Sequence, residues 1–131
     1  MDNETKYGNW IPFKKPLKGR HSFDGLTITK FKKIGLPQDF CLKNNIERYQ
    51  YAVFYFDGTI PAIGIEFTTI KQPGCALISW YKQTDAASLS CADFFRAFDL
   101  DAVELAGRYP YTVSQTEEGR PLYVINLADR V

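Results

Sequence analysis

Two short motifs, 54 residues apart, organise the whole chain. The first is the run Lys33-Ile34-Gly35-Leu36-Pro37-Gln38-Asp39-Phe40. Pro37 has the fixed backbone angle that suits the first position of a helix, and the helix dipole favours a carboxylate such as Asp39 in the first turn. The run therefore predicts a short apolar strand that leads directly into a short helix.

The residues on either side of this run extend the pattern. Residues 26–29 alternate and are β-branched, which predicts a strand before it. Asn44-Asn45 can end the helix through a left-handed cap, and Ile46 anchors its exit. Residues 51–56 are apolar on both faces, as in a strand covered on both sides. Asp57-Gly58 predicts a turn, and residues 62–67 alternate as a further strand.

The second half of the chain repeats this order. Residues 75–81 predict a strand, 82–85 a turn, and Ser90 with Asp93 the start of a helix. Residues 109–113 and 122–127 predict two more strands. The second motif, Cys91-Ala92-Asp93-Phe94, matches the last four residues of the first motif at a separation of 54. We interpret the chain as two tandem β-β-α-β-β units, and chance agreement is the alternative because few residues are identical.

One such unit is too small to bury its own apolar face. Two units that interlock their hairpins can close a small barrel and remove exposed strand edges. The predicted fold is therefore mainly β with short helices, a small closed barrel over residues 26–131. Its repeats are 26–72 and 75–127, and it follows an extended arm, residues 1–25, rich in bases and aromatic residues.

Length, charge and cysteine content exclude several classes. The 131 residues suit one domain, and 45% hydrophobic and 24% charged residues exclude a disordered chain. No apolar run approaches the roughly 20 residues that cross a bilayer, and no signal peptide is apparent, so we expect a cytoplasmic protein without membrane contact. Three cysteines and one histidine, with no paired spacing, predict no metal site and no cofactor.

Charge is unevenly distributed along the chain. Residues 1–72 carry a net charge of +4 and residues 73–131 a net charge of −3. Such asymmetry leaves room for one basic face. In the arm, Lys18 and Arg20 stand among aromatic residues and prolines. Either the aromatic side chains pack on the domain while the bases are solvated, or the arm reaches a polyanion.

Residues 26–67 resemble the swapped-hairpin domain of AbrB/MazE/SpoVT-type transcription factors. The residues that carry the resemblance are those of the run 33–40, then Ile46, 52–55 and 63–65. In that family two identical chains interlock and basic side chains on one face meet DNA. The resemblance implies that one chain here performs the role of the dimer. Lys33 and Arg96 occupy basic positions of the family pattern, whereas Cys41, Leu42 and Ala87 stand where bases are expected.

Two non-enzymatic functions follow from these residues. The first is a DNA-binding transcriptional regulator, which needs phosphate contacts from a basic face. Its candidate contacts are Lys30, Lys32, Lys33, Lys43, Arg96, Lys18 and Arg20. The alternative is a protein-interaction module on the same barrel that has lost DNA binding. Its candidate anchors are Tyr49, Tyr51, Trp80, Tyr81, Tyr109 and Tyr111.

An enzyme is disfavoured, because the single histidine, His21, lies in the arm beside Ser22 with no second base in sight. Either binding function is compatible with a monomer or a homodimer.

Overall fold

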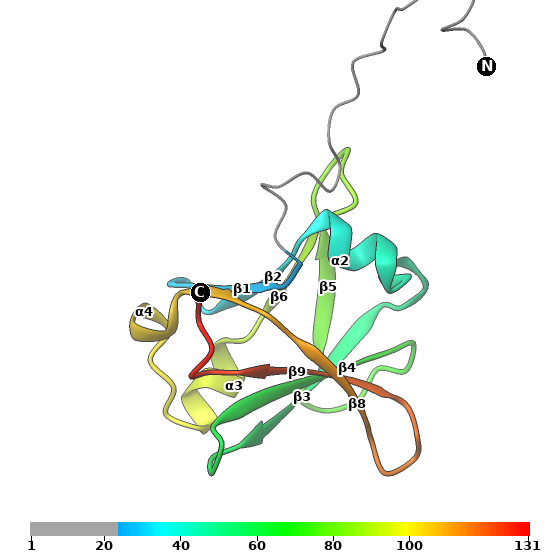
Figure 1. Cartoon of the computed structure of the whole chain (residues 1–131). Coiled ribbons are helices and arrows are strands. Elements are labelled where there is room, and N and C mark those ends of the chain that lie inside the picture. Colours follow the sequence, from blue (N-terminus) through cyan, green and yellow to red (C-terminus); the bar gives the residue numbers. More distant parts are fainter. Residues whose placement is uncertain (1–23) are drawn as a thin grey trace, which may run out of the picture.

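A computed structural model describes residues 24–131 as a mainly β fold, in which nine antiparallel strands form one curled sheet shaped as a half-barrel (Figure 1). The arm predicted over 1–25 lies outside the described residues except for its last two positions, and Lys18, Arg20 and His21 lie outside them too. The first-half elements are β1 Leu26–Thr29, β2 Lys33–Leu36, α2 Gln38–Lys43, the 3-10 helix η1 Ile46–Arg48, β3 Tyr51–Asp57 and β4 Ala62–Thr68.

The second half contains two α-helices, whereas the first contains one α-helix and one 3-10 helix. Its elements are β5 Ala76–Trp80, β6 Ala87–Ser90, α3 Ala92–Ala97, α4 Ala102–Leu105, β7 Gly107–Tyr109, β8 Thr112–Gln115 and β9 Pro121–Asn126. The strand order across the sheet is β7-β1-β2-β6-β5-β3-β4-β9-β8. Strands of the two halves are therefore neighbours at four places, β7-β1, β2-β6, β5-β3 and β4-β9.

The two six-residue helices end in the same way. In α2, Asn44 N donates to Phe40 O at 3.1 Å, and in α3 Phe98 N donates to Phe94 O at 3.2 Å. The next residue is left-handed in both, with φ of 52° at Asn45 and 56° at Asp99. The predicted left-handed stop at Asn44-Asn45 is confirmed, and short polar side chains tolerate this conformation best.

Two sequence predictions about the second half are wrong. Ser90 was expected to start the helix, but it is the last residue of β6, and Cys91 precedes α3 without a side-chain cap. The strand predicted over 109–113 is broken into β7 and β8, with Pro110 and Tyr111 between them. The break has a simple cause, because proline has no N–H to continue a strand ladder.

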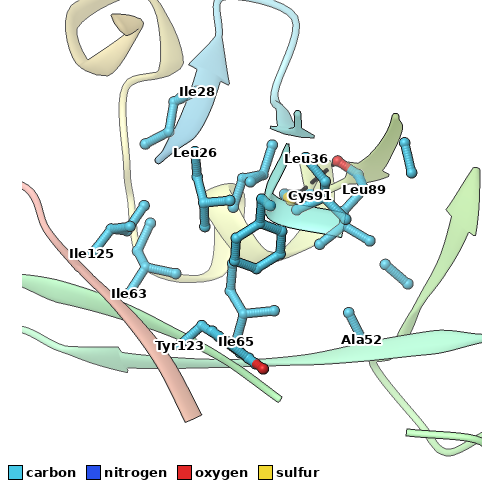
Figure 2. Packing of buried hydrophobic residues seen from close by; sticks show 14 of the residues in the cluster. Leu26, Ile28, Leu36, Ala52, Ile63, Ile65, Leu89, Cys91, Tyr123 and Ile125 are labelled. Atoms are coloured by element: carbon cyan, nitrogen blue, oxygen red, sulfur yellow. Dashed lines mark hydrogen bonds between the residues drawn. The ribbon is translucent and has the colours of Figure 1, made fainter. Parts of the chain in front are cut away.

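One apolar cluster fills the concave side of the sheet. Figure 2 shows Leu26 and Ile28 of β1, Ile63 and Ile65 of β4, and Ile125 of β9 pointing into the same interior. Ile63 faces Ile125 across the β4-β9 pair, and Ile65 faces Tyr123. Burial of such side chains supplies the main drive to fold. The core is thus shared between strands from both halves of the chain.

Candidate nucleic-acid interface

Three of the predicted DNA contacts lie together in the turn between β1 and β2. Thr29 Oγ1 accepts hydrogen bonds from the backbone N–H groups of Phe31 and Lys33, each at 3.3 Å, and Thr29 O accepts one from Lys32 N at 3.1 Å. Lys32 adopts a left-handed conformation, with φ of 63°. This compact turn leaves the side chains of Lys30, Lys32 and Lys33 exposed.

Arg96 lies on a helix of the other half of the chain that begins beside this turn. The β2-β6 pair places Lys33 opposite Ser90, and Cys91 N donates to Lys32 O at 2.8 Å. The helix α3 begins at the next residue and carries Arg96 in its last turn. We call Lys30, Lys32, Lys33 and Arg96 the basic end.

Lys43 does not join this group. The strand β2 leaves the turn at Lys33 and reaches α2 at its opposite end, and Lys43 is the last residue of α2. Figure 1 shows α2, which carries Lys43, and α4 near opposite ends of the β1-β2 hairpin. The ammonium of Lys43 lies 3.1 Å from Asp24 Oδ2, and this hydrogen bond raises the pKa of Lys43. Of the seven predicted contacts, four are gathered and one is apart.

Carboxylates stand among the bases of the basic end. Arg96 Nη1 lies 2.8 Å from Asp93 Oδ1, on an exposed helix surface. Lys30 and Lys32 line a shallow depression of about 350 Å³ together with Asp99 and Asp101. An exposed ion pair contributes little free energy and is readily exchanged for another partner. The field at this end is therefore basic in places and acidic in others.

Aromatic side chains are exposed at the β1-β2 turn and where β5 leads into the β5-β6 turn. Phe31 is 73% exposed, and Lys30 Nζ lies 5.4 Å from its ring centroid. Trp80, the last residue of β5, is 39% exposed, and Tyr81, the first residue after it, is 53% exposed. Tyr109, in contrast, is fully buried, and its hydroxyl donates to Leu105 O at 2.6 Å. Of the six predicted protein-binding anchors, only Trp80 and Tyr81 have the expected exposure, since Tyr49, Tyr51 and Tyr111 are half-buried.

The two buried cysteine thiols, Cys41 and Cys91, have little nucleophilic character. Burial raises the pKa of Cys91 to about 12. For Cys41, burial and the nearby Asp85 carboxylate raise the pKa to about 12. Only the thiolate is a strong nucleophile or metal ligand, so neither group is prepared for such chemistry near neutral pH. Within residues 24–131, no group of three or more His, Cys, Asp or Glu side chains is placed to hold a metal ion.

The sequence did not point to a buried carboxylate on β4. Glu66 is 4% exposed, Tyr55 Oη donates to its Oε1 at 2.7 Å, and Arg120 Nε donates to its Oε2. Burial alone would raise the pKa of Glu66, but the hydrogen bonds from Arg120 and Tyr55 outweigh it and lower the pKa. Alternation along 62–67 placed this residue on the outer face, and only the fold shows that Tyr55 and Arg120 cover it.

Comparison with known proteins adds no relative. No family model, curated protein or solved structure matches the chain. Among the described helices, none has the length and apolar character needed to cross a bilayer.

Proposed function

We propose that the chain is an AbrB-like pseudo-dimer, two interlocked β-β-α-β-β units that together close a small barrel. Strand pairing supports this arrangement. The hairpin β1-β2 has its counterpart in β5-β6, and each hairpin also pairs with the other half, through β7-β1 and β3-β5. At the centre, β2 pairs with its own counterpart β6, and β4 with its counterpart β9. This is the connectivity expected of two units that exchange hairpins.

The register of the central pair supports the same proposal. A shift of 54 residues converts the pair Lys33–Ser90 into Ala87–Leu36, and Ile34–Leu89 into Ser88–Gly35, which are pairs of the same ladder. The same shift carries α2 onto α3 and the left-handed Asn45 onto the left-handed Asp99. Chance agreement between unrelated segments does not predict this coincidence of register, helix ends and backbone conformation.

Closure of the barrel follows from treating two edge strands as one. The outermost strands of the sheet are β7 and β8, and only Pro110 and Tyr111 separate them in the chain. As one bent strand, they join the two edges of the curled sheet and leave it without ends. In the first half, the single strand β3 corresponds to β7 and β8 taken together. It is likewise bonded on one side to β4 and on the other to β5.

We propose that this protein is a non-enzymatic, duplex-DNA-binding regulator and that the basic end is its contact surface. One observation carries the proposal: the β2-β6 pair and the Lys32 O to Cys91 N hydrogen bond bring bases from two distant segments to one end. Lysine and arginine contacts to phosphates supply most of the affinity for duplex DNA. Four such contacts give a slope of about −3.6 in a plot of log K against log salt concentration.

A salt titration of full-length protein with a labelled duplex tests the proposal. We expect Lys32→Gln and Arg96→Gln each to reduce the slope by about 0.9 and to weaken binding several-fold at low salt. The control is Lys71→Gln, which removes one charge from an exposed loop position outside the basic end. Affinity that ignores salt, or equal losses in the control, would reject DNA binding by this surface.

A protein-interaction module is the second candidate, favoured by the exposed Trp80 and Tyr81. Adjacent Trp and Tyr side chains that remain exposed are typical anchors of a protein interface. If the duplex does not bind at low salt, this candidate takes precedence. Loss of a partner from the Trp80→Ala variant, with the fold intact, would then support it.

A further inference from the structure

We infer that the pseudo-dimer contacts DNA with one end only, so that a single chain binds a DNA site without twofold symmetry. The inference rests on the proposed function and deepens it, because it says which kind of site the protein takes. It follows from a comparison of the basic end with the matching positions at the other end.

The matching positions carry no bases. A shift of 54 residues places Ala87 at the position of Lys33, and Leu42 at the position of Arg96. For the first strand of each hairpin and the turn that follows it, the shift is 51, because Ile78 pairs with Leu89 as Thr27 pairs with Gly35. That shift places Gln83 at the position of Lys32, and the two residues have φ of 60° and 63°.

The other end differs from the basic end in the charge of its side chains. A depression of about 210 Å³ lies where α2 meets the β5-β6 turn, and it is lined by Cys41, Leu42, Glu47, Trp80, Thr84 and Asp85. Its charged lining residues are both carboxylates, which repel phosphates. Ala87 is 1% exposed, so its position has no room for a solvated base. We call this surface the acidic end.

Two lysines lie near the acidic end, but neither stands at a position that matches a base of the basic end, because Lys43 corresponds to Ala97 and Lys82 to Phe31. Lys43 is engaged by Asp24. Lys82 is exposed in the β5-β6 turn, two positions before Thr84, which lines the depression.

A symmetric dimer presents the same contacts twice, and its DNA sites mirror that symmetry as inverted half-sites. This chain presents them once. The bound complex should therefore contain one chain per site and place the basic end toward the DNA in one orientation. A palindromic site offers no advantage in affinity over one of its halves.

Charge removal at the two ends tests the inference. With full-length protein and a labelled duplex of random sequence, we expect Lys32→Gln and Arg96→Gln to weaken binding about three- to tenfold near 50 mM salt and to lower the salt slope. The matched variants Lys82→Gln and Lys43→Gln should stay within about twofold of the parent. Thermal unfolding confirms that each variant is folded.

The outcomes separate this inference from the function on which it rests. Equal losses at both ends mean that both ends contact DNA, which overturns the one-ended model and keeps DNA binding. If none of the four substitutions changes the affinity, the contact surface lies elsewhere, and the proposed function of the basic end fails. A complex with two chains per minimal duplex also overturns the one-ended model.

Discussion

At the scale of single residues, the proposed DNA binding makes Asp93 a competitor of a DNA phosphate for Arg96. The two side chains form an exposed ion pair at 2.8 Å. Asp93→Asn removes one negative charge from the basic end, and we expect DNA affinity to rise about two- to fivefold at low salt, because phosphates meet less repulsion. Stability should change by less than about 0.5 kcal/mol. Asp85→Asn at the acidic end is the control; a similar gain there would show a general effect of net charge.

Phe94 and Phe95 are neighbours with different roles. The 54-residue match puts Phe94 in the place of the buried Phe40, but Phe95 is the fully buried side chain, while Phe94 is half-buried against Phe54 and Phe98. We expect Phe95→Ala to lower the free energy of unfolding by about 3–5 kcal/mol and Phe94→Ala by about 1–3 kcal/mol. Urea denaturation measures both. Equal losses would mean that Phe94 is part of the core.

Glu66 makes stability depend on pH in acid. Its pKa is lowered in the folded protein, so its contribution is fully present above the pKa it has in the unfolded chain. That contribution is lost as the pH falls below about 4.5 and through the folded pKa. The unfolding free energy of the parent should fall over this range, and that of Glu66→Gln should fall less steeply. Parallel curves would exclude Glu66 as the titrating group.

At the scale of elements, the left-handed residue after each short helix directs the chain into the next element. Asn45 and Asp99 both have positive φ and are exposed. We expect Asn45→Ala to destabilise the fold by about 1 kcal/mol, because alanine pays a steric cost in this conformation, whereas Asn45→Gly should be nearly neutral. Urea midpoints compare the two. If alanine and glycine behave alike, the conformation at this position does not limit stability.

Local patterns predicted most of the elements, and the errors occurred where distant residues decide. Alternation located β1 and β4, and the polar pair Asn44-Asn45 located the end of α2. Helix α4 was not expected; Asp101 caps it by accepting from the N–H groups of Val103 and Glu104, and Arg130 Nη1 donates to Glu104 O at 2.7 Å. That last contact joins residues 26 positions apart, so no local pattern contains it.

In the candidate site, too, local sequence patterns were predictable, and contacts between distant residues were not. The lysines of the β1-β2 turn are adjacent in sequence, so their grouping was predictable from the sequence alone. The separation of Lys43 from them depends on the direction in which β2 runs away from the turn. The position of Asp99 and Asp101 beside Lys30 and Lys32 depends on the pairing of β1 with β7 and of β2 with β6, which joins distant parts of the chain. Sequence therefore predicted the bases but not the carboxylates that limit them.

At the scale of the whole molecule, the proposed pseudo-dimer implies that bases can be introduced at the acidic end in positions that match those of the basic end. Leu42 is 48% exposed at the position of Arg96, and Asp39 stands three residues before it, as Asp93 does before Arg96. Gln83 already has the backbone conformation of Lys32. The double variant Leu42→Arg/Gln83→Lys thus adds two bases at positions whose counterparts carry them.

If both ends belong to one continuous surface across the pseudo-twofold, the added bases reach the same duplex. We expect the salt slope of Leu42→Arg/Gln83→Lys to steepen by about 1.8 and its affinity to rise, because two more counterions are displaced for each complex. The control is Glu117→Gln, which changes the net charge in the same direction at the turn between β8 and β9. An unchanged slope in a folded double variant would mean that a duplex on the basic end does not extend to the acidic end. The two ends would then be separate surfaces, each free to hold its own partner.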